Sequence, residues 1–197
     1  MAVDGRTAFV DKDGTLLDDV PYNVDPARMR LARGAAEGVA LLHEAGYRIV
    51  VVSNQSGVAR GMFPEGALAA VELRLRALLL DAAGVPLTDF VYCPHHPDGS
   101  VAAYARACEC RKPLPGMIEA AARRHRIDVA SSWMIGDILD DVEAGRRAGC
   151  RTVLVDAGTE TEWRTSRLRT PDHVVPDLAA AAHAVVGAGA RAGTVTR

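Results

Sequence analysis

Short apolar runs alternate along this chain with longer segments in which apolar residues recur at helical spacing. The apolar runs lie around residues 9–10, 47–52, 90–92, 133–135 and 151–155. The run at 47–52 is rich in valine and has no polar alternation, which is typical of a parallel strand covered on both faces. Because strand and helix alternate throughout, we expect an α/β fold, a parallel sheet with helices on both faces.

Glycines mark the ends of several predicted helices. The helices that begin near residues 34, 65 and 138 are each followed by a glycine, namely Gly46, Gly84 and Gly149. Asp177 is expected to cap a last, Ala-rich helix, and residues 187–197 to be a flexible tail. No repeat or linker divides the chain, so we predict a single domain over residues 1–186.

The composition agrees with one soluble domain that has a full core. Of the 197 residues, 49% are hydrophobic and 24% are charged. No apolar run approaches the roughly 18–20 residues of a membrane span, and the N-terminus lacks the charged-then-apolar pattern of a signal peptide. The net charge of −2 gives no sign of affinity for nucleic acid or membranes. We therefore expect a cytoplasmic protein, by default a monomer, that acts on a small molecule.

Polar residues follow the predicted strands, where open α/β sheets usually place their chemistry. Asp11 and Asp13 end the first run and precede Gly14; Ser53 ends the second, and Asp137 follows the fourth. Taken singly, each has an ordinary alternative: an Asp-Gly turn, a turn serine or a helix cap. At successive strand ends they would gather at one edge of the sheet, which favours a common site.

These residue types supply what phosphoryl transfer requires. Asp11 can attack phosphorus and form an aspartyl-phosphate, and Asp13 can move protons to and from the leaving group and water. Ser53, with the backbone amide of Asn54, can donate hydrogen bonds to phosphoryl oxygens. Asp137 can complete a magnesium site with Asp11.

Lysine is rare in this chain, since only Lys12 and Lys112 accompany 21 arginines. A background lysine is therefore improbable at either position. Lys112 can supply a fixed positive charge to the phosphoryl group. Strand alternation predicts that Lys12, between the two aspartates, points away from the site.

Three cysteines and a histidine form two closely spaced pairs, with twelve residues between them: Cys93, His95, Cys108 and Cys110. Three thiolates and an imidazole are a complete tetrahedral set for structural zinc. The alternative is a group of buried reduced cysteines. Zinc would hold an otherwise irregular loop rigid just before Arg111 and Lys112.

Four ordered motifs resemble those of the haloacid dehalogenase (HAD) superfamily of phosphatases: Asp11-x-Asp13-Gly14-Thr15, Ser53-Asn54, Lys112-Pro113 and Gly136-Asp137-x-x-x-Asp141. The resemblance implies a Rossmann-like core and a magnesium-dependent phosphomonoester hydrolase. Asp11 would be the nucleophile, Asp13 the acid and base, and Ser53 and Lys112 the groups that stabilise the phosphoryl group. Magnesium would bind Asp11, the carbonyl of Asp13, and Asp137. The intervals between motifs leave no room for a cap domain, so we expect a capless, open site.

Within that superfamily, the chain is similar to the D-glycero-D-manno-heptose 1,7-bisphosphate 7-phosphatase family. The stretches that carry this similarity are residues 54–61, NQSGVARG, residues 93–99, CPHHPDG, and residues 108–113, CECRKP. The implied substrate is a sugar bisphosphate. The alternatives are a histidinol-phosphate phosphatase, which shares the zinc signature, another phosphatase of small phosphomonoesters, and a non-catalytic protein with a zinc loop. The similarity implies a set of substrate-binding residues: Asp19, Val20, Pro21, Tyr22, Ser53, Asn54, Gln55, Ser56, Arg111 and Lys112. Among these, Arg111 would recognise the second phosphate or the hydroxyls of the substrate, which suits its bidentate fork. Ile138 departs from the family, which usually has a basic residue there, and so removes a positive charge.

Overall fold

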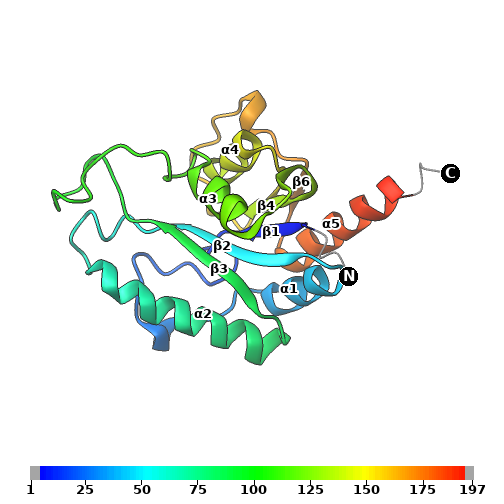
Figure 1. Ribbon diagram of the computed structural model, residues 1–197, viewed down its shortest axis with the longest axis horizontal. Coiled ribbons are helices and arrows are strands. Elements are labelled where there is room, and N and C mark those ends of the chain that lie inside the picture. Colours follow the sequence, from blue (N-terminus) through cyan, green and yellow to red (C-terminus); the bar gives the residue numbers. More distant parts are fainter. Residues whose placement is uncertain (1–4, 194–197) are drawn as a thin grey trace.

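The computed structural model describes residues 5–193 (Figure 1). Its strands are β1 (Thr7–Val10), β2 (Arg48–Asn54), β3 (Leu87–Cys93), β4 (Trp133–Gly136), β5 (Arg151–Val155) and β6 (His173–Val175). Its α-helices are α1 (Ala35–Glu44), α2 (Leu68–Ala83), α3 (Gly116–His125), α4 (Leu139–Ala148) and α5 (Leu178–Gly193). Four short 3₁₀ helices lie in the connections, at Pro26–Arg28, Glu65–Ala67, Val129–Ser131 and Arg167–Arg169.

The six strands form one parallel sheet in the order β3-β2-β1-β4-β5-β6. The strand β1 lies inside the sheet, between β2 and β4. The order reverses direction at β1, because the chain first builds outward through β2 and β3 and then returns to the other side of β1. Such a switch point leaves a crevice at the carboxyl ends of the strands. The predicted α/β fold is confirmed.

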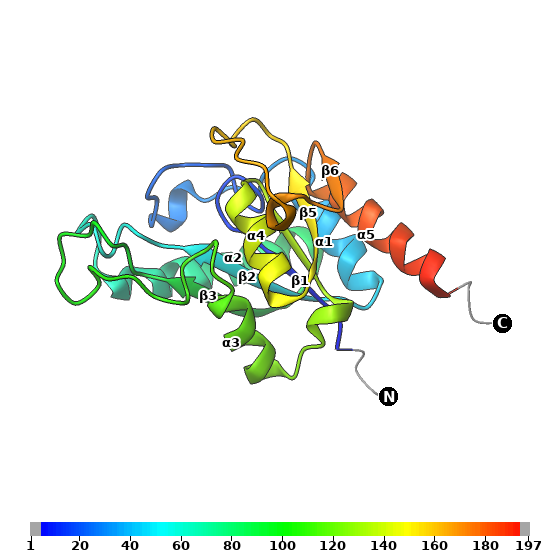
Figure 2. The same ribbon diagram turned by 90° about the horizontal axis from the view of Figure 1, so that it is seen from above.

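Helices cover both faces of the sheet, as Figures 1 and 2 show. Along β1, Ala8 and Val10 pack with residues of α1, α2 and α5, whereas Phe9 packs on the opposite side with residues of α3 and α4. All three side chains are fully buried. Because successive residues of a strand face opposite sides, a strand covered on both faces must be apolar throughout, which explains the uninterrupted valine run of β2.

The helix α5 extends through Gly193, beyond the boundary at residue 186 that the sequence suggested. Its glycines lower helix propensity, but Val185 and Ala188 are buried against the core and hold the helix in place. Residues 187–193 of the expected flexible tail thus belong to α5, and residues 194–197 lie outside the described part of the chain.

Four connections surround the carboxyl edge of the sheet, at residues 18–33, 55–64, 94–115 and 156–172. The second and third lie side by side, because the backbone N–H of Val101 donates to the carbonyl of Ala59 at 2.9 Å (Figure 2). Between residues 5 and 193 no further folded unit is inserted between the motifs, as expected for a capless site. None of the helices in this range is both long and apolar enough to cross a membrane.

Candidate active site

The acidic pair leaves the sheet at the carboxyl end of β1. The backbone N–H of Asp11 still donates to the carbonyl of Ile135 on β4, at 2.9 Å. At Gly14 the backbone takes a φ of +83°, and a Cβ there would lie 2.3 Å from Oδ2 of Asp137. Only glycine fits this turn without displacing that carboxylate. The hydroxyl of Thr15 donates to the other oxygen of Asp137 at 3.0 Å, so the first and last motifs are joined directly.

Lys112 is the buried cation of the site, with only 3% of the residue exposed. Its Nζ forms ion pairs with Asp11 and, at 2.6 Å, with Asp141, and donates to the carbonyl of Val52 at 3.2 Å. Burial lowers the pKa of Lys112, but the charges of Asp11 and Asp141 raise it by more, so the net shift is upward. Lys112 therefore stays protonated at neutral pH.

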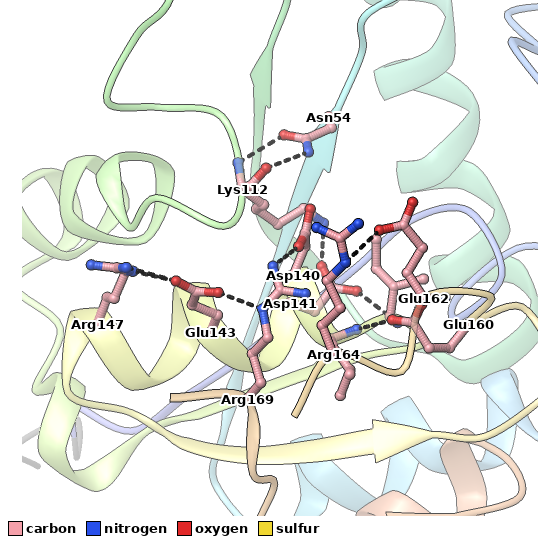
Figure 3. Close-up of polar contacts among 12 residues, drawn as sticks. Asn54, Lys112, Asp140, Asp141, Glu143, Arg147, Glu160, Glu162, Arg164 and Arg169 are labelled. Atoms are coloured by element: carbon pink, nitrogen blue, oxygen red, sulfur yellow. Dashed lines mark hydrogen bonds and ion pairs between the residues drawn. The ribbon is translucent and has the colours of Figure 1, made fainter. Parts of the chain in front are cut away.

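The backbone of Lys112 is held by the side chain of Asn54, at the end of β2 (Figure 3). The amide of Asn54 donates to the carbonyl of Lys112 at 3.1 Å and accepts from its N–H at 3.0 Å. This side chain therefore fixes the lysine relative to the sheet, and substrate binding by Asn54 stays a prediction.

Three carboxylates converge on this lysine. Those of Asp11, Asp137 and Asp141 each offer an oxygen within 4.8 Å of the others. The ammonium of Lys112 balances one of these three negative charges, so two remain in excess. Burial together with the charge of Asp11 raises the pKa of Asp137 to about 6. Oxygen ligands with an excess charge of two fit a divalent cation such as Mg²⁺. Asp11 and Asp137 were the predicted magnesium carboxylates, and the carbonyl of Asp13 remains a predicted ligand.

Asp141 has a larger part in the site than its sequence position suggested. It is fully buried, forms an ion pair with Lys112, and accepts the backbone N–H of Ile138 at 3.3 Å. Burial raises the pKa of Asp141, against the opposing effect of Lys112. The signal in the sequence was the second aspartate of the last motif, four residues after Asp137 and in the first turn of α4.

The prediction that Lys12 points away from the site is wrong. Lys12 is 1% exposed, its Nζ lies 2.9 Å from Oδ1 of Asp13, and it lines the pocket beside that residue. Strand alternation fails here because β1 ends at Val10, so Lys12 belongs to the turn. Burial raises the pKa of Asp13, and Lys12 partly offsets that rise. Both lysines of the chain therefore lie at the site.

A pocket of about 260 Å³ opens beside Asp13. Six of the predicted substrate-binding residues line it, namely Asp19, Pro21, Tyr22, Asn54, Gln55 and Ser56. Lys12, Asp13, Asn23 and Gly57 complete its wall. Val20, Ser53, Arg111 and Lys112 are not part of this lining. Ser53 is buried beneath it, with its hydroxyl 2.7 Å from the amide nitrogen of Gln55.

The connection after β5 supplies contacts that the sequence did not suggest. Thr159 donates to the backbone carbonyl of Asp137 at 3.3 Å, and Glu160 accepts the N–H of Leu139 at 2.6 Å, at the start of α4. This segment forms a fourth wall of the site. Thr159 and Glu160 are not part of a recognisable sequence motif. Their position near Asp137, a predicted magnesium ligand, is therefore visible only in the folded structure.

Ile138 leaves its side of the site without the basic residue usual in the family. It lines a second cavity, of about 420 Å³, with Arg164 and Arg169. Arg169 is ion-paired with Asp140 and Glu143, and Arg164 with Glu162 (Figure 3). Neither arginine of this cavity is thus an unpaired substitute for the missing charge.

The four predicted zinc ligands come together at the base of the loop 93–112. Sγ of Cys108 lies 3.5 Å from that of Cys93 and 3.3 Å from that of Cys110, and Nδ1 of His95 lies 3.3 Å from Sγ of Cys110. Sγ of Cys110 lies 3.0 Å from that of Cys93, so several of these separations are shorter, by up to about 0.5 Å, than the roughly 3.5–3.8 Å between the ligands of tetrahedral zinc. The hydrogen bond from Cys93 is the largest effect that lowers the pKa of Cys110, to about 5. The donor set therefore fits a structural zinc ion.

Comparisons with known proteins agree with this geometry. The model of the HAD-hydrolase-like family matches residues 109–181. The chain is 42% identical over 151 residues to the D-glycero-β-D-manno-heptose-1,7-bisphosphate 7-phosphatase of Yersinia pestis, covering 76% of this chain and 80% of that protein. It is 37% identical over 161 residues to the corresponding α-anomer phosphatase of Photorhabdus laumondii, covering 81% of this chain and 87% of that one.

A solved structure is similar along its whole length. The D,D-heptose 1,7-bisphosphate phosphatase from B. bronchiseptica, complexed with magnesium and phosphate, shares 32% identity and a TM-score of 0.74. The match covers 92% of this chain and 99% of that one. Together with the motifs and their geometry, these similarities show that the chain belongs to the HAD phosphatases, in the family of the heptose 1,7-bisphosphate 7-phosphatases.

Proposed function

We propose that this protein removes the 7-phosphate from D-glycero-D-manno-heptose 1,7-bisphosphate and leaves the 1-phosphate in place. The observation that carries the proposal is the buried ion pair of Asp11 and Lys112 near Asp13, a residue that lines an uncapped pocket. A nucleophile, a proton carrier and a fixed cation lie together there. The relatives named above act on this substrate, in either anomer.

In the first step, a carboxylate oxygen of Asp11 attacks phosphorus. The bond from phosphorus to the C7 oxygen breaks, and that oxygen takes a proton from Asp13 as it leaves. Burial raises the pKa of Asp13, which favours the protonated form needed here. Asp11 then carries the phosphoryl group as an acyl phosphate.

In the second step, water attacks phosphorus and gives its proton to Asp13. The bond to Asp11 breaks, inorganic phosphate leaves, and both aspartates return to their first state. Lys112 and Ser53 stabilise the charge on the phosphoryl oxygens in both steps. A bound Mg²⁺, held by Asp11, Asp137 and the Asp13 carbonyl, would neutralise part of that charge.

We propose one phosphatase domain that acts as a cytoplasmic monomer, and α5 extends its predicted boundary at residue 186 to Gly193. The support for this proposal is that the four motifs belong to a single sheet and that one chain supplies all the groups named. The walls of the site are loops, so a long substrate can reach Asp11 without the movement of a cap.

A phosphate-release assay tests the proposal. We expect turnover of one or both heptose 1,7-bisphosphate anomers at least tenfold more efficient than that of histidinol phosphate or fructose bisphosphate. Preference for histidinol phosphate would contradict the assignment of substrate.

The variant Asp11→Asn tests the mechanism. Loss of the nucleophile is expected to lower kcat by at least about 10⁴-fold, with the melting temperature nearly unchanged because Lys112 keeps Asp141 as a partner. The exposed Asp81→Asn, which removes the same charge from the end of α2, is the matched control. Substantial activity of Asp11→Asn would exclude an aspartyl-phosphate at this residue.

A further inference from the structure

The helix α4, which follows the predicted magnesium ligand Asp137, begins without a side-chain cap of its own. Ile138 occupies the N-cap position with an extended backbone, at φ −125° and ψ 159°. An isoleucine side chain has no atom that can accept a hydrogen bond, unlike the polar residues usual at this position. The first N–H of the helix, that of Leu139, therefore needs an acceptor from another part of the chain.

Glu160, in the connection after β5, supplies that acceptor. Its Oε2 accepts the backbone N–H of Leu139 at 2.6 Å, and its Oε1 accepts that of Glu162 at 2.6 Å. A carboxylate suits this place, because the first amides of a helix carry a partial positive charge. Both oxygens of Glu160 are thus used by backbone donors, so this residue is placed to hold the start of α4 rather than to bind a metal ion.

The neighbour of Glu160 contacts the other end of the same short segment. The hydroxyl of Thr159 donates to the backbone carbonyl of Asp137 at 3.3 Å. Thr159 and Glu160 therefore hold the backbone on both sides of Ile138, one through the carbonyl of Asp137 and the other through the N–H of Leu139. The direction of the Asp137 carboxylate depends on this backbone.

A second attachment ties the connection to α4 ten residues later. Arg169 forms ion pairs with Asp140 at 2.5 Å and with Glu143 at 2.6 Å (Figure 3). Between the two attachments the chain is exposed, and the side chain of Trp163 is 55% accessible to solvent. Residues 159–169 thus form a strap that is fastened to the first turns of α4 at both of its ends.

We propose that Glu160 is a positioning residue for magnesium, which fixes the start of α4 so that the carboxylate of Asp137 stays aimed at the metal site. Without the metal, Asp11, Asp137 and Asp141 repel one another around a single lysine, and a loose start of α4 would let Asp137 turn away. Holding the ligand in advance lowers the cost of binding the cation. By linkage, bound magnesium holds the strap more firmly. This inference rests on the magnesium site of the proposed function and not on the identity of the sugar.

Glu160→Ala tests the inference on zinc-loaded protein from which magnesium has been removed. Titration calorimetry with magnesium chloride, without substrate, is expected to give a dissociation constant about tenfold higher than that of the wild type. Glu160→Gln keeps an oxygen for the N–H of Leu139 but loses the charge, and is expected to raise the constant by about threefold. The matched control is Glu162→Ala, which removes the next carboxylate of the strap, paired with the exposed Arg164 at 3.4 Å. It should keep the wild-type constant.

Trp163 reports on the strap without any measurement of activity. The second tryptophan of the chain, Trp133, is only 2% exposed, so acrylamide quenches the fluorescence of Trp163 almost alone. Magnesium is expected to reduce this quenching in the wild type and to leave it unchanged in Glu160→Ala.

Kinetics separate positioning from a general loss of structure. At saturating magnesium, kcat of Glu160→Ala is expected to return to within about threefold of the wild type, and KM for the bisphosphate to within about twofold. The reason is that the strap does not line the pocket beside Asp13. A purely structural role would instead lower kcat and the melting temperature at every magnesium concentration. If Glu160→Ala does not fold, Glu160→Gln carries the same comparison.

The outcomes distinguish the positioning role from the magnesium site itself. A wild-type protein that binds magnesium, with both Glu160 variants binding it equally tightly, overturns the role of Glu160 alone. An equal weakening in Glu162→Ala also overturns it, because the effect would then not come from the contact with Leu139. A wild-type protein that binds no magnesium, and releases phosphate without it, overturns the magnesium mechanism of the proposed function and the positioning role with it.

Discussion

The carboxylate of Asp13 is held on both of its oxygens. Lys12 lies 2.9 Å from Oδ1, and the amide nitrogen of Gln55 lies 3.5 Å from Oδ2. Gln55 is in turn fixed by Ser53 at 2.7 Å. Burying an ammonium costs free energy unless the ammonium is paired. Lys12 is almost completely buried, so its ion pair with Asp13 is needed to offset that cost. We interpret Lys12 as a positioning residue that keeps Asp13 aimed at the leaving-group oxygen.

Lys12→Met is expected to lower kcat by about 10- to 100-fold while KM changes by less than about threefold, because a misaimed proton donor slows the chemistry more than binding. Lys12→Arg should restore most of the activity, since a guanidinium can form the same ion pair. Steady-state kinetics on the bisphosphate measure both parameters. An unchanged kcat in a folded Lys12→Met protein would show that Asp13 is aimed without this lysine.

Both lysines could be noticed in the sequence, but only one could be placed. Lys112 lies two residues after a predicted zinc ligand and precedes a proline, a context that assigns it to the site. Lys12 follows a strand whose end cannot be located to within one residue by its apolar pattern. Its direction depends on a turn in which Leu17 donates to the carbonyl of Lys12 at 2.8 Å, and that contact exists only in the folded chain.

At the scale of elements, the loop 93–112 contains the four predicted zinc ligands. It joins β3 to α3 without a helix or strand of its own. Cys93 ends β3, whereas Cys108 and Cys110 lie just before Arg111 and Lys112. Ordering so many residues costs about 1–2 kcal/mol each in backbone entropy. Zinc is expected to offset much of this cost and so to hold Lys112 in place.

Cys108→Ala is expected to remove zinc, to open residues 94–107 to proteolysis, and to lower kcat/KM by at least about tenfold. The sheet should persist, because Tyr104, Cys108 and Cys110 of the loop are only partly buried against its core. Zinc content, limited proteolysis and phosphate release measure the three effects. Cys150→Ala, at a buried cysteine outside the zinc group, should keep both zinc and activity. Full activity in a zinc-free protein would show that the loop needs no metal.

The elements themselves were largely predictable, whereas the connections were not. Glycines with positive φ follow α1, α2 and α4 at the expected residues, Gly46, Gly84 and Gly149. The connection after β5 has neither an apolar period nor a motif, so its contacts to Asp137 and α4 could not be inferred. The last helix was predicted too short because glycine lowers helix propensity, and tertiary packing of Ala188 outweighs that local preference.

At the scale of the whole molecule, the parallel sheet brings together motifs that are more than a hundred residues apart. Asp11 follows β1, Asn54 ends β2, and Asp137 follows β4, and these three strands are neighbours. Parallel strands present all their carboxyl ends at one edge, so this gathering follows from the alternation of strand and helix. The alternation of strand and helix does not predict the charge balance of the site. That balance depends on the burial of Asp141 and on which side chains contact Lys112.

That charge balance predicts how magnesium and pH act on stability. The pKa of Asp137 is about 6 in the folded protein, whereas the ordinary pKa of an aspartate, which applies to the unfolded chain, is 3.8. Between these values the folded state binds more protons than the unfolded state, so the free energy of unfolding falls as pH rises, by roughly 3 kcal/mol in all. Magnesium binds the deprotonated carboxylate and opposes this loss.

We therefore expect millimolar magnesium to raise the melting temperature little at about pH 4.5 and by several degrees at about pH 7. Thermal unfolding with and without the metal across this range measures the effect. The side chain of Asp137→Asn does not titrate, so magnesium should raise the melting temperature of this variant only slightly at every pH. A magnesium shift that is equal at both pH values in the wild type would mean that Asp137 does not bind the metal, since protons and the cation would then not compete for its carboxylate.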